Sequence, residues 1–133
     1  MMIAGSCHCG AIRYQAEVDP TRVTICHCKD CQRLTGAAYR VSVGTTREAF
    51  VLERGTPKIY VKKADSGASR AQVFCPECGS PLFTYDLADS AAYGLRVGCI
   101  DQRSELIPSK QIWCRSALPW SMDIAALPRR DAE

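Results

Sequence analysis

Seven of the nine cysteines lie in three short groups, and thiolate sulfur is both a zinc ligand and a nucleophile. The groups are Cys7-x-Cys9, Cys26-x-Cys28-x-x-Cys31 and Cys75-x-x-Cys78. Two pairs supply four thiolates, which complete a tetrahedral zinc site, whereas a group of three leaves the fourth position open. A complete site stabilises a fold, and an open one can take part in a reaction. The function of the chain therefore depends most on the group of three.

The strongest single signal is the C-x-x-C segment that begins at Cys75. In a zinc knuckle the backbone turns so that both sulfur atoms face one ion at about 2.3 Å. Pro76 restricts one dihedral angle of that turn, and Gly79 can adopt the positive φ that follows it. The alternative is a redox-active dithiol, but that motif starts a helix in a βαβ unit, which the sequence does not indicate. We therefore predict that Cys75 and Cys78 bind zinc.

A C-x-x-C pair needs two further ligands, and Cys7 and Cys9 are the natural partners. In an extended strand, residues i and i+2 point to the same side, so both sulfur atoms can reach one metal ion. His8 would then point away from the ion, as a surface or packing residue. Such a site closes a long loop between the N-terminus and Cys75. In the alternative, two cysteines of the group of three complete the site, and Cys7 and Cys9 are left over.

The group of three runs from the end of one predicted strand into the start of a predicted helix. The partial positive charge at a helix N-terminus favours thiolate at Cys28 and Cys31. Three ligands leave a position for water, a substrate or an external thiol. His27 is an alternative fourth ligand, although its place between Cys26 and Cys28 strains that geometry.

Short strands must position these groups, because apolar and polar residues alternate along much of the chain. The pattern predicts strands at residues 10–18, 23–28, 38–43, 50–52, 58–61, 71–75, 82–85, 93–97 and 111–115. Residues 29–35 are predicted to form a short helix that ends at Gly36. Residues 54–57 are predicted to join the strands on either side of them as a hairpin. Closely spaced strands with turn signals between them indicate a mainly β fold of packed sheets.

The length and composition fit one globular domain over residues 1–133, with a frayed tail at residues 128–133. No apolar run approaches the roughly 20 residues of a membrane span, and the first residues do not have the pattern of a secretory signal. We therefore expect a cytoplasmic protein without a membrane partner. In that compartment thiols stay reduced, so clustered cysteines indicate metal binding rather than disulfides.

The formal net charge of +3 counts every cysteine as neutral. Zinc binds thiolates, and seven thiolates with two zinc ions lower the net charge to about zero. Proteins that bind nucleic acid usually carry a basic surface. We therefore expect no nucleic-acid partner.

Residues 5–13, 26–36, 74–83 and 113–120 resemble the glutathione-dependent formaldehyde-activating enzyme family, whose domain also occurs in centromere protein V. The resemblance runs through nearly the whole chain and includes all seven grouped cysteines. It implies an Mss4-like fold, a mainly β structure in which stacked antiparallel sheets form a β-tent with zinc knuckles. It implies a structural zinc on Cys7, Cys9, Cys75 and Cys78, and a second zinc on Cys26, Cys28 and Cys31.

The resemblance also implies carbon–sulfur lyase activity, the reversible joining of glutathione and formaldehyde to S-hydroxymethylglutathione. The cysteines catalytic in this reaction would be Cys26, Cys28 and Cys31, acting through the second zinc, where glutathione or a similar thiol binds. We expect this second zinc to leave more readily than the structural one, because it has fewer protein ligands. The oligomeric state is left open.

Several other residues are candidates for supporting roles. Lys29, Arg33 and Arg40 lie near the open site in the sequence and can pair with the carboxylates of glutathione. Asp30 is the nearest carboxylate, and it is better explained as a charge at the helix start than as a proton carrier. Trp120 is a candidate for the wall of the binding pocket or for core packing.

Three alternatives to an enzyme of this kind come from other classes. The first is a thiol carrier without catalysis, since thiols and formaldehyde also combine spontaneously. The second is an interaction module in which both zinc ions only stabilise a docking surface. The third is a thiol-based reductase that uses Cys99 or Cys114, although a lone cysteine in a strand-like segment is usually a small buried side chain.

Overall fold

The computed structural model describes all 133 residues, and most of its regular structure consists of β-strands. The strands are β1 (Met2–Ser6), β2 (Arg13–Glu17), β3 (Val23–Cys26), β4 (Arg40–Thr46), β5 (Phe50–Arg54), β6 (Lys58–Lys63), β7 (Ser69–Phe74), β8 (Pro81–Asp86), β9 (Ala92–Arg96) and β10 (Lys110–Ile112). The one α-helix is α1 (Lys29–Thr35), and the 3-10 helices are η1 (Val97–Cys99), η2 (Arg103–Glu105), η3 (Cys114–Ser116) and η4 (Pro119–Met122). The prediction of a mainly β fold is confirmed.

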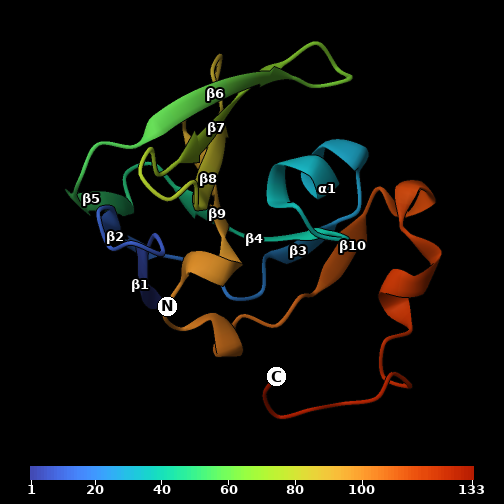
Figure 1. Cartoon of the computed structure of the whole chain (residues 1–133). Helices are drawn as coiled ribbons and strands as arrows, with labels where there is room; N and C mark the ends of the chain where they lie inside the picture. The colour runs from blue at the N-terminus through green and yellow to red at the C-terminus, as the bar shows by residue number, and fades with distance from the viewer.

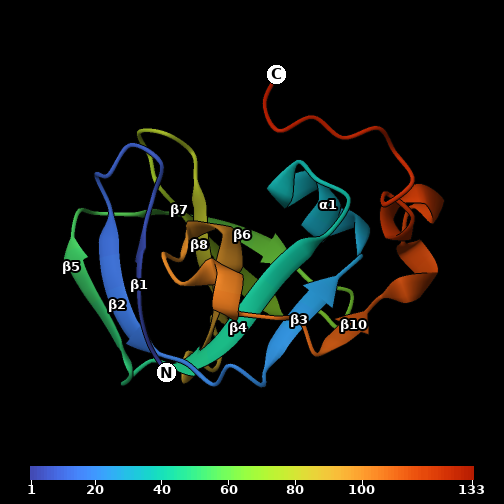
Figure 2. The ribbon, with the colours of Figure 1, turned by 90° about the horizontal axis from the view of Figure 1, so that it is seen from below.

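The strands form two sheets (Figure 1). The smaller sheet has the order β1-β2-β5, and the larger has the order β10-β3-β4-β9-β8-β7-β6. Every pairing is antiparallel except that of β10 with β3, which is parallel. Figure 2 shows the small sheet on one side of the molecule and α1, β3 and β10 on the other. The expected stacked antiparallel sheets are therefore confirmed, with one parallel pairing at an edge.

The core lies between the two sheets and is built from the inward-facing residues of their strands. Tyr14 from the small sheet and Val43 and Leu95 from the large sheet are all 0% exposed. Phe50 on β5 connects the sheets, because its ring centroid lies 5.2 Å from that of Tyr14 and 4.8 Å from that of Phe83. Burial of side chains of this size contributes about 1.5–3 kcal/mol each, so these contacts fix how one sheet sits on the other.

The opposite face of the large sheet is polar, because side chains alternate between faces along each strand. Cross-strand pairing places Cys26 opposite Arg40, and places Ser42 opposite both Thr24 and Arg96. Residues paired in this way lie on the same face of a sheet. The polar face therefore brings a cysteine and two arginines together, and α1 lies over its β3–β4–β10 end (Figure 1).

The helix forms at the predicted residues, and it ends at Gly36 in the left-handed conformation with a φ of 64°. Strand β1 has no counterpart among the predicted strands. One of its inward-facing positions is Gly5, which shows no hydrophobic alternation in the sequence. A Cβ atom at Gly5 would lie 2.2 Å from the ring of Tyr14, so this glycine makes room for the buried tyrosine.

The predicted hairpin at residues 54–57 is wrong. Strand β5 pairs with β2 in the small sheet, whereas β6 pairs with β7 in the large one. Gly55 has a φ of 87°, and the chain uses this bend to cross between the sheets rather than to reverse. The same turn residues can serve both purposes, and here the packing of Phe50 on the core holds β5 in the small sheet.

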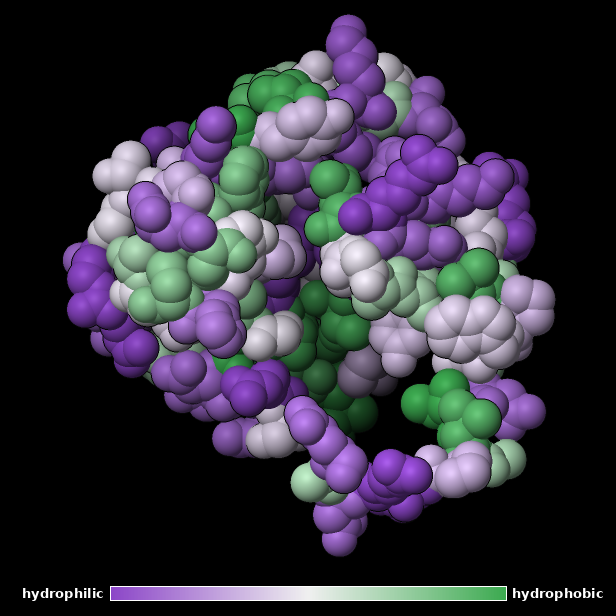
Figure 3. Space-filling view, viewed as in Figure 1, coloured by the Kyte–Doolittle hydropathy of each residue, from purple (hydrophilic) through white to green (hydrophobic).

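No helix of the structure combines the length and the apolar character that crossing a bilayer would need. After η4 the chain has no helix or strand as far as Glu133, so the predicted tail at residues 128–133 lies within an irregular segment. Figures 1 and 3 show this segment standing away from the body of the molecule. Ile124 and Leu127 are exposed on it.

Candidate metal centres

Four cysteine sulfur atoms from two distant turns form the first cluster, the four-thiol cluster. The Sγ atoms of Cys7, Cys9, Cys75 and Cys78 all lie within 4.8 Å of one another. The Sγ atom of Cys9 lies 3.6 Å from that of Cys7 and 3.8 Å from that of Cys75. Sulfur atoms bound tetrahedrally to one zinc ion are separated by about 3.8 Å. The cluster therefore has the size and the donor atoms that a zinc ion requires.

Cys7 and Cys9 come together through a turn, and the expectation of an extended strand is wrong at this point. The amide of Gly10 donates to the carbonyl of Cys7 over 3.1 Å, and Gly10 has a φ of 79°. The amide of Ile12 donates to Cys7 Sγ over 3.2 Å. A backbone N–H that donates to sulfur stabilises the thiolate, which is the form that binds metal. His8 is exposed and does not belong to the cluster.

The turn from Cys75 to Cys78 has the geometry predicted for a knuckle. The amide of Gly79 donates to the carbonyl of Cys75 over 2.9 Å, and Gly79 has a φ of 77°. The hydroxyl of Ser80 lies 3.2 Å from Cys78 Sγ, and this hydrogen bond lowers the pKa of Cys78 to about 5. Cys75 is buried and Cys78 is exposed. A thiolate is therefore favoured at Cys78 even before a metal binds.

The second cluster, the three-thiol cluster, holds the sulfur atoms of Cys26, Cys28 and Cys31 within 4.8 Å of one another. Cys26 ends β3, and Cys28 caps the N-terminus of α1, where its Sγ accepts a hydrogen bond of 3.2 Å from the amide of Cys31. The side chain of Gln32 donates to the carbonyl of Ser116 over 3.0 Å and ties α1 to the segment after β10. The strand-to-helix corner predicted from the spacing therefore gathers all three sulfur atoms.

His27 does not belong to the three-thiol cluster. Its ring is 0% exposed, and its Nε2 lies 2.7 Å from Oε1 of Gln111. No histidine or carboxylate completes a group with the three sulfur atoms, so the cluster offers three protein ligands. The two clusters are separate, and the alternative in which two of these cysteines join Cys75 and Cys78 is not realised.

Negative charge is favoured at Cys26 and disfavoured at Cys31. The hydrogen bond from Cys31 lowers the pKa of Cys26 to about 5, and the charge of Arg40 acts in the same direction. That hydrogen bond and burial raise the pKa of Cys31. One thiolate therefore exists at neutral pH before any metal binds, so the cluster fits a metal ion in charge as well as in donor atoms.

The three-thiol cluster opens into a cavity of about 740 Å³, called the thiol cavity below. Its charged lining consists of Lys29, Arg40, Lys62, Arg70, Arg96 and Arg115 against Asp30 and Asp65. The Nζ atom of Lys62 lies 2.9 Å from the carboxylate of Asp30. Of the cations expected from the sequence, Lys29 and Arg40 line the cavity and Arg33 does not. Hydrophilic side chains gather around α1 on the surface (Figure 3). The cavity therefore has an excess of positive charge.

Arg96 is the most buried of these cations, with 5% of its surface exposed. It donates to Ser42 Oγ over 2.7 Å and to Gln72 Oε1 over 3.0 Å, and the same oxygen accepts from Arg40 over 3.1 Å. Neither arginine is part of an ion pair. Burial, followed by repulsion from Arg40, lowers the pKa of Arg96 to about 9, so it stays charged at neutral pH. A buried charge without a close ion-pair partner is unfavourable; the nearby thiolate at Cys26 offsets part of it, and an anion in the cavity would compensate it further.

Sequence reasoning missed Arg96. The feature of the sequence that could have identified it is the position of an arginine among apolar residues inside the predicted strand at 93–97. The alternation of that strand places Arg96 on the face opposite Leu95, but the sequence does not show that this face lines a cavity.

Trp113, rather than Trp120, lines the thiol cavity. It follows β10 and has a φ of 57°, and the guanidinium of Arg115 lies 4.9 Å from its ring centroid. A bulky residue in this conformation is rare and often lies at a ligand site. Trp120 is 60% exposed and lies outside the cavity.

The two single cysteines lie outside both clusters. Cys99 is half-buried, and its thiol donates to the carbonyl of Pro81 over 3.2 Å. Burial raises the pKa of Cys99, which disfavours the thiolate that a nucleophile needs. Cys114 is exposed and begins η3. Neither residue has the surroundings of an activated thiol.

Several curated proteins and solved structures resemble this chain, and three of them are described here. A Halomonas elongata protein with a provisional name as a glutathione-dependent formaldehyde-activating enzyme is 29% identical over 90 residues, which cover 65% of this chain and 57% of that protein. A Schizosaccharomyces pombe protein named an uncharacterized lyase is 27% identical over 79 residues, covering 59% of this chain and 54% of that protein. The matches thus cover little more than half the length of these curated relatives.

A crystal structure of a Rhodobacter sphaeroides protein has the same fold, with a TM-score of 0.63 and 20% identity. The match covers 81% of this chain and 98% of that one. The family model described as glutathione-dependent formaldehyde-activating enzyme matches residues 2–116, which include both cysteine clusters and every residue that lines the thiol cavity. This chain therefore belongs to the glutathione-dependent formaldehyde-activating enzyme family.

Proposed function

We propose that the chain is a carbon–sulfur lyase that binds glutathione, or a similar small thiol, at the three-thiol cluster and reversibly joins it to formaldehyde. One observation carries the proposal: three clustered thiols without a fourth protein ligand face a cavity with six cations. The names of the relatives agree with this class of reaction. The volume of about 740 Å³ also falls within the range of roughly 300–1,000 Å³ that small-molecule sites have.

The two clusters have separate roles in this proposal. The four-thiol cluster holds a structural zinc on Cys7, Cys9, Cys75 and Cys78. Cys26, Cys28 and Cys31 hold a second zinc and leave one position for the thiol of the ligand. A zinc ion held by these cysteines would supply a Lewis acid, which would lower the pKa of a bound thiol and polarise a carbonyl oxygen.

The cations of the thiol cavity bind and orient the ligand. Glutathione carries two carboxylates, and Arg40 and Arg96 offer guanidinium groups beside the cysteines without any carboxylate partner of their own. Charge-assisted hydrogen bonds of this kind are about twice as strong as neutral ones. The same positive charge favours the thiolate form of the ligand over the thiol form.

The reaction needs one bond to form and one to break. The thiolate sulfur attacks the carbonyl carbon of formaldehyde, and a carbon–sulfur bond forms while the carbonyl π electrons move to oxygen. The resulting alkoxide takes a proton from water, and the proton of the original thiol goes to solvent. Asp30 does not serve as the proton carrier, because its carboxylate is held by Lys62 at 2.9 Å.

The test compares the rate of adduct formation with and without protein. We expect the zinc-loaded protein to accelerate formation of S-hydroxymethylglutathione, and Cys28→Ser to return the rate to the spontaneous one. Cys114→Ser is the matched control and should keep full activity, since Cys114 is exposed and outside both clusters. A wild-type protein that leaves the spontaneous rate unchanged rules out the enzyme.

A thiol carrier without catalysis is the second candidate. It is favoured by the lack of a free acid or base among the side chains of the three-thiol cluster. Calorimetry with glutathione separates the candidates: binding without any acceleration of the reaction supports the carrier. A protein that shows neither binding nor acceleration supports an interaction module instead.

A further inference from the structure

The thiol cavity adjoins a second cavity of about 280 Å³, called the distal cavity, on the same face of the large sheet. Thr24, Ser42 and Gly94 line both cavities. Cross-strand pairing places Ser42 opposite Thr24 and Arg96, so these shared residues continue the row that begins beside the cysteines. The two cavities therefore form one groove, and the three-thiol cluster occupies only one end of it.

The floor of the distal cavity lacks side chains. Gly44 on β4 and Gly94 on β9 lie directly opposite each other, and neither has a positive φ that would require glycine. A Cβ atom at Gly44 would have as its nearest neighbour the guanidinium of Arg22, at 3.8 Å. The backbone at Gly44 would therefore accept a larger residue, whereas a Cβ atom at Gly94 would lie 3.2 Å from the side chain of Thr84. The missing side chain at Gly44 leaves the groove deeper at this point.

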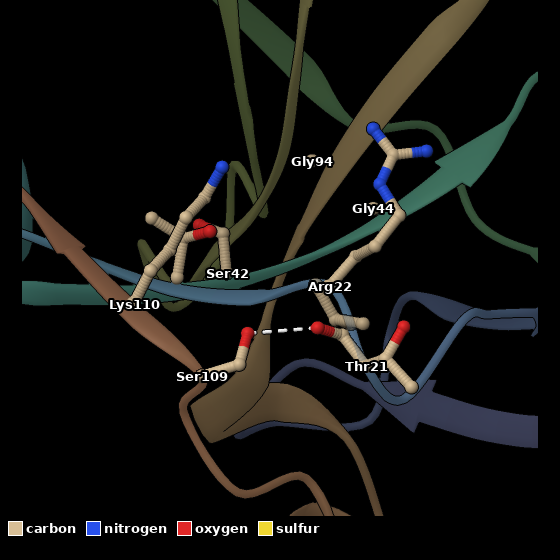
Figure 4. Close-up of a pocket in the computed structure, with 9 residues that line it drawn as sticks. Thr21, Arg22, Ser42, Gly44, Gly94, Ser109 and Lys110 are labelled. Carbon is tan, nitrogen blue, oxygen red and sulfur yellow. Dashed lines mark hydrogen bonds between the residues drawn. The ribbon is translucent and has the colours of Figure 1, made fainter.

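Two cationic residues, Arg22 and Lys110, lie at the ends of this floor and are called the distal pair below. Arg22 precedes β3 and Lys110 begins β10, and Figure 4 shows both side chains extending to the same side of the sheet beside Gly44 and Gly94. The hydroxyl of Ser109 donates to the carbonyl of Thr21 over 2.7 Å and joins the two segments that carry the pair (Figure 4). This hydrogen bond holds the two backbone segments that carry the pair next to each other.

Neither cation of the distal pair has a carboxylate within ion-pair distance, although the pKa of the nearby Asp19 carboxyl is lowered first by its hydrogen bonds with Thr21 and then by the charge of Arg22. The three ion pairs of the molecule involve neither Arg22 nor Lys110. The carboxylate of Asp19, which precedes Arg22 by three residues, accepts hydrogen bonds from the amide and hydroxyl of Thr21 at 2.9 and 2.6 Å. Two cations beside an empty-floored groove favour an acidic group of a ligand.

We propose that Arg22 and Lys110 form a distal anion subsite, which binds an acidic group at the far end of the thiol ligand; this rests on the proposed function. Arg40 lies opposite Cys26 and precedes Gly44 by four residues of β4, a distance of about 13 Å. An extended peptide of three residues spans about 10 Å, and the long side chains of the pair line the cavity at the far end of this path. The ligand class is therefore a peptide-like thiol with a terminal carboxylate, and small thiols such as cysteine are too short.

The first test removes the charge of the distal pair. We expect the double variant Arg22→Gln/Lys110→Gln to bind glutathione about tenfold more weakly than the wild-type zinc protein in calorimetry. Its affinity for 2-mercaptoethanol, which has a thiol and no acidic group, should not change. The control Arg47→Gln/Lys63→Gln removes the same charges from exposed positions outside both cavities. Unchanged glutathione affinity, or equal weakening for both thiols, would overturn the subsite.

S-Methylglutathione separates this subsite from the proposed function, because it keeps both carboxylates but has no free thiol. We expect the wild-type protein to bind it measurably and the double variant to bind it about tenfold more weakly, even if no reaction with formaldehyde is accelerated. Absence of binding to the wild-type protein, or equal binding to both proteins, rejects the subsite. Loss of catalysis alone rejects only the enzyme.

The second test fills the floor with a single methyl group. Gly44→Ala should leave the melting temperature unchanged, since its Cβ makes only ordinary van der Waals contact. We expect it to weaken glutathione binding several-fold and to leave 2-mercaptoethanol unaffected. Gly98→Ala is the control, because a Cβ atom there meets nothing within 4 Å. Wild-type affinity for glutathione in Gly44→Ala would overturn the path over the floor.

Discussion

The two cysteine clusters use the same side chain but connect the chain differently. The four-thiol cluster joins turns that are far apart in the sequence, with Cys9 and Cys75 separated by 66 residues. The three-thiol cluster comes from the six residues between Cys26 and Cys31. A metal ion in the first cluster would therefore crosslink the fold, whereas a metal ion in the second would bind to a local segment that the fold already positions.

The solvent exposure of the cysteines does not distinguish the proposed structural cluster from the proposed reactive one. The four-thiol cluster includes two exposed cysteines, whereas Cys31 of the three-thiol cluster is only 2% exposed. Cys7 and Cys75 are buried as well, and Cys26 and Cys28 are half-buried, so neither cluster is the more exposed throughout. The proposed reactive site is reached through the thiol cavity. The proposed roles of the two clusters therefore rest on the number of ligands and the charge around them rather than on exposure.

The largest effect should come from breaking the four-thiol cluster. Cys75 is 0% exposed, and Cys75→Ser removes one of four ligands from a proposed site that closes a long loop. Structural zinc contributes about 10–16 kcal/mol in small zinc domains, so we expect this variant to be largely unfolded. Circular dichroism and zinc content check it. A cooperative melt close to that of the wild type would show that the cluster does not stabilise the fold.

The same change in the other cluster should affect function instead. Cys26→Ser removes one of three ligands at the end of β3 but leaves the four-thiol cluster intact. We expect adduct formation to fall to the spontaneous rate while the melting temperature drops by only a few degrees. If Cys26→Ser unfolds as completely as Cys75→Ser, the distinction between a structural and a reactive cluster is wrong.

Removal of zinc with a chelator tests which of the two clusters holds its metal ion more firmly. Three protein thiolates hold zinc less firmly than four, so a chelator titration should empty the three-thiol cluster first, with retention of fold, and the four-thiol cluster later, with unfolding. Zinc release and circular dichroism measured together follow both steps. The exposure of Cys9 and Cys78 would favour the reverse order, so simultaneous or reversed release would show that exposure outweighs ligand number.

A smaller effect should follow from removing the buried charge beside the three-thiol cluster. Arg96→Met replaces an unpaired buried charge with an apolar side chain, so we expect little change or a slight gain in the free energy of unfolding. Glutathione should bind about tenfold more weakly, as expected when a charge-assisted contact is lost. Arg33→Met, on an exposed position outside the thiol cavity, serves as the control. Strong destabilisation by Arg96→Met would assign Arg96 a structural role.

The sequence predicts the parts of the two clusters that depend on local geometry. The spacing of Cys26, Cys28 and Cys31 predicts the strand-to-helix corner, and the helix forms at the predicted residues 29–35. The glycine after Cys78 predicts the knuckle, because a positive φ at Gly79 is a local requirement. In each case the residue type restricts its own backbone.

The rest depends on contacts between distant segments. The bend at Gly55 is equally compatible with a hairpin and with a crossing between sheets, and only the packing of Phe50 against Tyr14 and Phe83 separates the two. Arg96 and Arg22 are ordinary arginines in the sequence, and they line the groove only because the large sheet turns its polar face toward it. Neither the crossing at Gly55 nor the placement of these arginines can be recognised from the neighbouring residues in the sequence.

The placement of the two tryptophans gives the protein its own optical reporter. Trp113 lines the thiol cavity beside Arg115, and Trp120 is exposed on η4 outside it. These are the only tryptophans of the chain. Indole emission in a Trp120→Phe variant would therefore come from the cavity alone, and the arrival of a thiol ligand can be followed in real time without any label.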